Sequence, residues 1–196
     1  MKPFLVLSTS SPRVAVGVIG EDNSGQPQML SKEGAFVERN AEEATFLLLH
    51  EALDKAGARL EDLVGIVADV GPGSFTGVRV GVTIAKTLAW AKGLPVAGVR
   101  SFALISEPPV AVPSRKGRYL ALHTTGEVEE VEDETVRTVA AAGYGSAFPD
   151  PLYPDPERVL LHWSDLRWAQ PEELVPEYVL EPGISKPKVP YPNIEP

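Results

Sequence analysis

The first hundred residues alternate between short apolar runs and longer amphipathic stretches, which predicts a mixed α/β fold. The run at residues 63–68 is rich in β-branched side chains and is typical of a buried strand. Residues 13–18 alternate strictly, which indicates a hairpin with the run before them. The predicted strands are residues 4–7, residues 14–19, a third strand that includes Met29 and Leu30, residues 63–68 and residues 94–99.

A first long helix is predicted over residues 40–56. Asn40 is a suitable N-cap residue, and Gly57 is typical of the position just after a helix. One apolar line runs through Phe46, Leu49 and Leu53, and a second lies beside it. This apolar surface is wider than a helix buried on one side requires. Two interpretations stay open: a helix packed deeply within one domain, or a helix with one face on the sheet and the other on a second protein.

A second helix is predicted over residues 76–92. Small residues recur every four positions along it, at Gly77, Gly81, Ala85 and Ala89. An interior glycine costs about 1 kcal/mol relative to alanine, so Gly81 implies a packing reason. The small residues form a bare ridge that another backbone can approach closely. Ile84 and Leu88 belong to a bulkier line beside this ridge.

A glycine-rich turn joins the strand at residues 63–68 to this helix. Free amides and the helix dipole point the same way at such a junction, which makes it a candidate anion site. The turn lacks the Gly-Lys-Ser/Thr ending of a Walker loop, and its glycine spacing differs from the dinucleotide fingerprint. A turn whose glycines serve packing alone is the alternative. The residues of the candidate phosphate-proximal turn are Gly71, Gly73, Ser74, Thr76 and Gly77.

The net charge of −9 over 196 residues argues against direct tRNA binding as the main task, because so acidic a chain repels phosphates. Much of the acid lies in residues 127–134, for which a solvated hairpin edge is favoured over a metal or partner site. The chain has no cysteine. The apolar run at the N-terminus is too short for a signal peptide or a membrane span, so we expect a cytoplasmic protein without a membrane anchor.

The pattern changes at Pro108 and Pro109, which mark a predicted domain boundary. Residues 1–107 form the predicted N-terminal lobe with the two helices, and residues 108–196 form a smaller C-terminal lobe. Within the second lobe, residues 118–123 and 127–132 predict a hairpin. Residues 156–168 show helical spacing and are expected to pack back on the sheet. Residues 186–196, with four prolines, predict an extended tail.

The run Val-Gly-Pro-Gly-Ser-Phe-Thr-Gly-Val-Arg-Val-Gly at residues 70–81 resembles the TsaB (YeaZ) family. Ala-Lys-Thr-Leu-Ala at residues 85–89 and Gly-Leu-Pro-Val-Ala-Gly-Val at 93–99 extend the resemblance, which returns at residues 176–180 and 185–188. The resemblance implies an actin-like or hexokinase-like ATPase fold with two βββαβα-type lobes, the second reduced. It also implies a non-catalytic subunit that binds and activates TsaD in the synthesis of threonylcarbamoyladenosine on tRNA.

In that family the two helices form the surface used for homodimers and for pairing with TsaD. The resemblance therefore implies a TsaD-like catalytic partner, a TsaE-like ATPase as a further partner, a homodimer when the chain is alone, and little direct tRNA binding. No cofactor is required on this interpretation, and nucleotide bound without turnover is left open. The residues predicted for partner contact are Phe46, Leu49, Leu53, Gly77, Gly81, Ile84, Ala85 and Leu88.

Two other classes of function are weighed against the subunit. The first is a nucleotide-binding or ATP-hydrolysing enzyme, but the sequence has Ser8-Thr9-Ser10 where family members often keep Asp-Thr-Ser. A serine cannot supply the charge that holds a hydrated magnesium ion. The second is a peptidase with Ser74 as nucleophile, which lacks the Gly-x-Ser-x-Gly context and a placed histidine. The three histidines are far apart in the sequence, and no catalytic or metal-binding residue is predicted.

Overall fold

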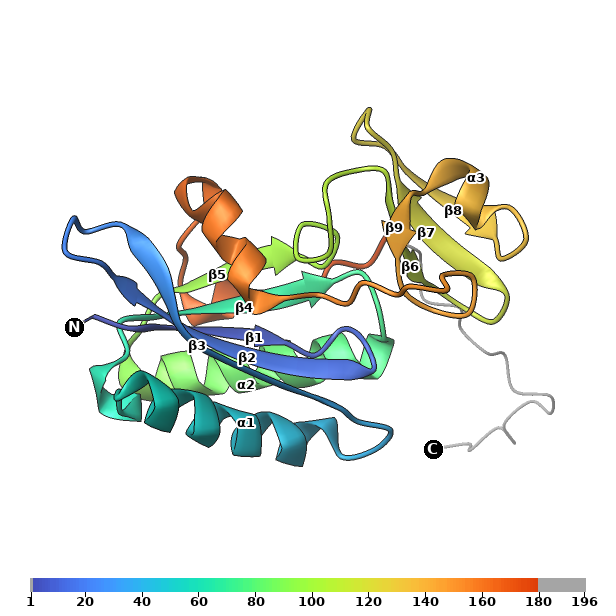
Figure 1. Cartoon of the computed structure of the whole chain (residues 1–196). Helices are drawn as coiled ribbons and strands as arrows, with labels where there is room; N and C mark the ends of the chain where they lie inside the picture. Colours follow the sequence, from blue (N-terminus) through green and yellow to red (C-terminus); the bar gives the residue numbers. More distant parts are fainter. Residues whose placement is uncertain (1, 180–196) are drawn as a thin grey trace, which may run out of the picture.

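A computed structural model describes residues 2–179 and places a five-stranded mixed sheet at the centre of the molecule (Figure 1). The strand order is β3-β2-β1-β4-β5. β1 pairs antiparallel with β2 and parallel with β4, so Leu7 lies beside Ala68. The strands are β1 (Phe4–Ser8), β2 (Arg13–Glu21), β3 (Pro27–Phe36), β4 (Gly65–Gly71) and β5 (Val96–Arg100).

Both faces of this sheet are covered, which explains why β4 is apolar along almost its whole length and buried throughout. The helices α1 (Ala41–Ala56) and α2 (Phe75–Lys92) lie side by side on one face, and the 3₁₀ segment η2 (Pro156–Asp165) lies on the other (Figure 1). Two short 3₁₀ turns, η1 (Leu60–Asp62) and η3 (Pro171–Glu173), complete this part. The main core therefore sits between the sheet and the helix pair.

Three of the four ends of the two helices carry residue types that are typical of helix termini and that cap the helix. Gly57 and Gly93 end α1 and α2 in the left-handed conformation, with φ of 63° and 64°. The Ser74 side chain caps α2 by accepting from the Gly77 amide at 3.2 Å. Asn40 differs from the prediction: it precedes α1 with φ of 62°, and its side chain makes no capping hydrogen bond. A side-chain cap requires an extended backbone at that position, which Asn40 does not have.

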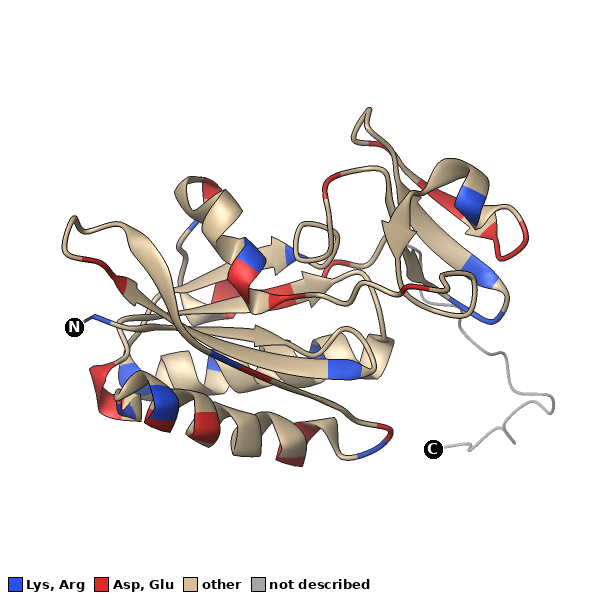
Figure 2. Cartoon of the chain, viewed as in Figure 1, with Lys and Arg blue, Asp and Glu red and all other residues tan. Residues whose placement is uncertain are grey.

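A second, smaller sheet lies beyond one end of the first (Figure 1). Its strand order is β8-β7-β6-β9, and β7 and β8 form the predicted hairpin. Glu130 and Glu132 of β8 pair with Arg118, and Glu130 also pairs with Arg115, so part of the acidic run is neutralised at this edge (Figure 2). The elements are β6 (Val110–Pro113), β7 (Arg118–Leu122), β8 (Val128–Glu132), α3 (Val136–Val139) and β9 (Ala142–Gly143).

After β9 the chain returns to the first sheet, as expected for residues 156–168. Trp163 and Trp168 pack on Phe4 of β1, with ring centroids 5.0 and 5.2 Å from it.

The assignment of residues 1–107 and 108–196 to two lobes stays a prediction; in the sequence, the two sheets lie on either side of Pro108. Residues 101–105 form consecutive turns. The predicted extended tail lies outside the described residues. Within residues 2–179, no helix combines the length and the apolar character needed to cross a membrane.

Lys32 of the edge strand β3 forms ion pairs with the start of η2, the segment that packs back on the first sheet. Lys32 Nζ lies 2.7 Å from both Asp155 Oδ2 and Glu157 Oε2. We expect Lys32→Met to lower the free energy of unfolding by about 0.5–1 kcal/mol in urea titrations, because two partly exposed carboxylates lose their cation. Lys55→Met is the matched control, since Lys55 also pairs with a glutamate of β3 but is more exposed. An equal loss in both variants would contradict a special role for Lys32.

Candidate functional site

The small-residue ridge of α2 faces the chain's own first hairpin. Gly77 and Gly81 are buried, and a side chain at either would overlap Thr9 in the turn after β1. The Thr9 hydroxyl donates to the Gly77 carbonyl at 2.6 Å. Ala85 is fully buried in the same core. The backbone that approaches this ridge is therefore the turn after β1, and not a second protein.

The predicted contact residues of α1 are mostly buried as well. Leu49 and Leu53 face the sheet, Ile84 of α2 is buried in the same core, and Leu88 is half-buried against it. Only Phe46 is exposed, at 39%. This corrects the sequence prediction for Leu49, Leu53, Gly77, Gly81 and Ala85, which belong to the core of this chain because both helices pack their apolar lines inside it. Ile84 is also largely buried, but it borders a groove on the outer side of α2.

The outer face of the helix pair carries a different set of residues. Its exposed apolar side chains are Phe46 and Leu47 on α1 and Phe75 and Trp90 on α2. A groove of about 340 Å³ runs between the helices, lined by Glu42, Phe75, Thr76, Arg79, Val80, Thr83 and Ile84. The helices also differ in charge (Figure 2): α1 carries four acidic residues and one lysine, whereas every charged residue of α2 is basic. The two helices of this face thus carry opposite net charge.

Arg79 is held rigidly at the end of this face. Its guanidinium carbon lies 3.9 Å from the centroid of the Phe75 ring, and its Nε donates to the Tyr178 hydroxyl at 3.0 Å. Stacking of a guanidinium on an aromatic ring orients the charged group, and the group stays accessible at the surface. The sequence analysis did not select Arg79, and its spacing of four from Phe75 on a helix was the available signal.

The glycine-rich turn is closed by hydrogen bonds within the chain. The amide of Ser74 donates to the Ser10 carbonyl at 2.7 Å, and the amide of Gly71 donates to Asp69 at 3.0 Å. Gly73 lies so close to Ser10 that a side chain there would overlap the Ser10 carbonyl. Thr76 is exposed on the groove side. Of the candidate turn, the amides of Gly71, Ser74 and Gly77 are therefore already occupied.

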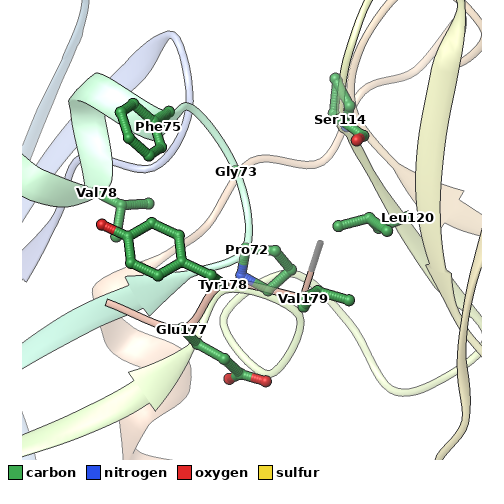
Figure 3. A pocket seen from close by; sticks show the side chains of 10 residues that line it. Pro72, Gly73, Phe75, Val78, Ser114, Leu120, Glu177, Tyr178 and Val179 are labelled. Carbon is green, nitrogen blue, oxygen red and sulfur yellow. The ribbon is translucent and has the colours of Figure 1, made fainter. Parts of the chain in front are cut away.

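A cleft lies between the start of α2 and the second sheet (Figure 3). Phe75, Val78 and Tyr178 line one side, and Ser114 and Leu120 line the other. Pro72 and Gly73 of the glycine-rich turn lie between these two sides, so the turn borders the cleft, whose volume is about 150 Å³. Its lining is mainly apolar, and Glu177 supplies the charged side chain. Glu177 pairs with Arg100 at 2.9 Å.

A buried carboxylate that the sequence analysis missed lies behind the turn. Asp69, near the end of β4, is 1% exposed and accepts hydrogen bonds from Ser8, Ser10 and Ser101. Burial raises the pKa of Asp69, and the serine hydroxyls act in the opposite direction. The available signal was an aspartate at the carboxyl end of a buried strand, where sites in α/β proteins commonly form.

The three histidines lie on separate elements and form no site together. His50 is exposed on α1, His162 lies in η2, and His123 follows β7, where its Nε2 lies 3.0 Å from Glu129.

Comparisons with known proteins found relatives in sequence and in fold. A family model described as "TsaD: tRNA N6-adenosine threonylcarbamoyltransferase" matches residues 28–119. The "tRNA threonylcarbamoyladenosine biosynthesis protein TsaB" of Bacillus subtilis is 33% identical over 98 residues, which are 50% of this chain and 41% of that protein. The "tRNA N6-adenosine threonylcarbamoyltransferase" of Paracoccus denitrificans is 35% identical over 134 residues, covering 63% of this chain and 38% of that protein. The matches thus span less than half the length of these two relatives.

Two solved structures share the fold over nearly the whole chain. "YeaZ from Pseudomonas aeruginosa" has a TM-score of 0.67 at 20% identity and covers 91% of this chain and 100% of its own. A second structure, of a protein with similarity to peptidase YEAZ from Pseudomonas aeruginosa, has a TM-score of 0.72 at 20% identity. It covers 92% of this chain and 100% of its own.

The predicted fold is confirmed: the chain shares the fold of the YeaZ structures, and its mixed sheets together with the TsaD match over residues 28–119 are consistent with an actin-like ATPase fold. Among proteins of this fold, the chain is a homologue of TsaB (YeaZ), which confirms the resemblance noted in the sequence.

The burial of the α2 ridge generates a prediction about stability. Gly81→Leu should lower the free energy of unfolding by about 3 kcal/mol, because the new side chain must displace Thr9 of the turn after β1. The measurement is urea unfolding followed by tryptophan fluorescence. Thr87→Leu, at an exposed position of the same helix, is the control and should leave the urea midpoint nearly unchanged. A Gly81→Leu variant with native stability would contradict the packing described for this ridge.

Proposed function

We propose that this chain is a non-catalytic subunit of the complex that makes N6-threonylcarbamoyladenosine on tRNA, where it binds and activates a TsaD-like catalytic subunit. The name of the Bacillus subtilis relative supports the pathway. The observation that carries the proposal is the outer face of α1 and α2, where Phe46, Leu47 and Phe75 are exposed and where Phe75 also lines a groove. Apolar side chains gathered around a groove and rimmed by charge are typical of a protein interface.

The charge pattern of this face supports a homodimer when the chain is alone. An isologous interface brings the same patch of two copies together. In an antiparallel arrangement, the acidic α1 of one copy faces the basic α2 of the other, so unlike charges meet twice. The same surface would then exchange a second copy for the TsaD-like partner. A TsaE-like ATPase is the further partner that the proposal includes.

A role without catalysis in this chain is supported by the chemistry of the glycine-rich turn. Its amides of Gly71, Ser74 and Gly77 already donate within the chain, so a phosphate would have to displace these bonds. Ser8 stands where related sequences often keep an aspartate, and its hydroxyl is taken by Asp69 at 2.7 Å. The proposal includes little direct tRNA contact, since the net charge is −9, and a cytoplasmic site of action, where tRNA is modified.

The subunit proposal is tested first at the exposed apolar centre of the helix pair. Phe46→Glu should weaken association with the TsaD-like protein of the same organism by at least about tenfold, since it places a charge in a desolvated centre. Light scattering after size exclusion and calorimetric titration measure the effect. The matched control is Leu161→Glu in η2 on the opposite face of the sheet, where the side chain is also exposed. Native affinity in the Phe46 variant would rule out this surface.

The alternative function is a nucleotide-binding or ATP-hydrolysing enzyme. Titration with ATP and Mg²⁺, with phosphate release followed in the same sample, separates the two. We expect no phosphate release above the buffer rate; binding without release would keep the subunit proposal and add a nucleotide to it. Release that is lost in a Ser8→Ala variant would favour the enzyme. A peptidase would require cleavage that is lost in Ser74→Ala, whose hydroxyl caps α2 here.

A further inference from the structure

Asp69 forms the most deeply buried charged cluster among residues 2–179. Its Oδ2 accepts from Ser8 Oγ at 2.7 Å and from Ser10 Oγ at 2.5 Å, and its Oδ1 accepts from Ser101 Oγ at 2.5 Å and from the Gly71 amide at 3.0 Å. Ser8, Ser10 and Ser101 are each fully buried. A buried carboxylate that accepts from four donors fixes the position of each donor. If one donor moved away, part of the buried negative charge would lose its hydrogen-bond partner, which costs free energy.

The four donors come from the ends of three strands of the first sheet and from the turn after β1. Ser8 ends β1 and Ser10 lies in the turn after it, whereas Gly71 opens the glycine-rich turn. Ser101 directly follows β5, at the start of the connection to the second sheet, and its amide donates to the Gly71 carbonyl at 2.7 Å. One side chain therefore holds the ends of three neighbouring strands together at a single edge of the sheet.

Ser10 extends the cluster into the second sheet. Its carbonyl accepts from the Ser74 amide at 2.7 Å and from the Tyr144 hydroxyl at 3.2 Å. Tyr144 follows β9 and is buried, so this bond crosses from the second sheet to the first hairpin. A displacement of Ser10 would disturb the start of α2 and the position of the second sheet together. The cleft of Figure 3 lies between these two elements.

Within residues 2–179, the groups that face Asp69 carry no positive charge. From the first hairpin and from β5 the facing groups are the serine hydroxyls, and from the second sheet the facing titratable group is the phenol of Tyr144. Arg100 at the end of β5 pairs instead with Glu177. Burial raises the pKa of Tyr144 as well, and the nearby Asp69 adds to this rise. The Asp69 carboxylate is thus stabilised by hydrogen bonds alone, and each of its two oxygens already accepts two of them.

We propose that Asp69 is a clasp that fixes the ends of β1, β4 and β5, and through Ser10 and Ser101 the position of the second sheet, and that this clasp requires one carboxyl group, which position 8 or position 69 can supply. The two positions are neighbours on the parallel strands β1 and β4, where Leu7 lies beside Ala68, and their side chains are in direct contact. The cluster needs one carboxylate and three hydroxyls, whichever of the two strands carries the carboxylate. This inference concerns the cleft between the sheets and is independent of the outer face of α1 and α2.

The test is a swap of the two side chains, compared with each single change. Asp69→Ser leaves the hydroxyls without their acceptor, and Ser8→Asp places two carboxyl groups in contact. In either single variant, hydrogen exchange at the amides of Ser74 and Ser101 should become at least tenfold faster, because both bonds depend on the positions of Ser10 and Gly71. Exchange within the β2–β3 pair serves as the internal control. The combined variant, Ser8→Asp with Asp69→Ser, should recover most of the native protection.

Two outcomes would overturn the proposal. If Asp69→Ser leaves the protection of Ser74 and Ser101 unchanged, there is no clasp. If the combined variant exchanges as fast as the faster single variant, position 8 cannot supply the carboxyl group. In neither case is the proposed subunit role affected, since association with the TsaD-like protein is measured separately through Phe46.

The pH dependence of unfolding provides a second readout. Because the pKa of Asp69 is raised in the folded state, its contribution to stability is full below the carboxyl pKa of the unfolded chain. It is lost as the pH rises through the folded-state pKa. Asp69→Asn cannot titrate, so its stability relative to the native chain should increase with pH from about 4 upward. Asp54→Asn, on the exposed side of α1, is the control. A pH-independent difference for Asp69→Asn would contradict a raised pKa of Asp69 in the folded state.

Discussion

The structure depends on the close approach of α2 to the turn after β1. Gly73, Gly77 and Gly81 allow that turn to lie directly against the helix, where any side chain would collide with it. The approach brings Thr9 within hydrogen-bonding distance of Gly77 and brings Ser10 against the glycine-rich turn. It also closes the space over Asp69, which is why a carboxylate near the end of β4 becomes fully buried.

This packing determines which surface is available for function. The side of α2 that carries its smallest residues packs inside the molecule, against the turn after β1 and the sheet. The helix therefore presents Phe75, Arg79 and Trp90 outward. The amides of Gly71, Ser74 and Gly77 donate to Asp69, to the Ser10 carbonyl and to the Ser74 hydroxyl, respectively. The chain retains the architecture of the actin-like ATPase class, while the polar groups of its turn serve internal closure. A function based on protein contact is therefore better supported than one based on phosphate chemistry.

The candidate site was predicted only in part, and the errors have a common cause. Gly81 and Phe46 lie on apolar lines of similar strength, yet one faces Thr9 and the other faces solvent. Helical periodicity shows that two faces exist but does not show which one the sheet takes. Asp69 was missed because its partners Ser8 and Ser101 are 61 and 32 residues away in the sequence. No local pattern connects them.

The sequence by itself determined the order of strands and helices in the first lobe and most helix ends, including Gly57 and Ser74. These features follow from local backbone preferences and from side-chain periodicity, which act within a few residues. Only the tertiary structure decided that Gly77 and Gly81 pack internally, that Asn40 does not cap α1, and that Asp69 gathers three serines. Each of these depends on the approach of segments that are distant in sequence, and the identity of a neighbour is decided only when the whole sheet is assembled.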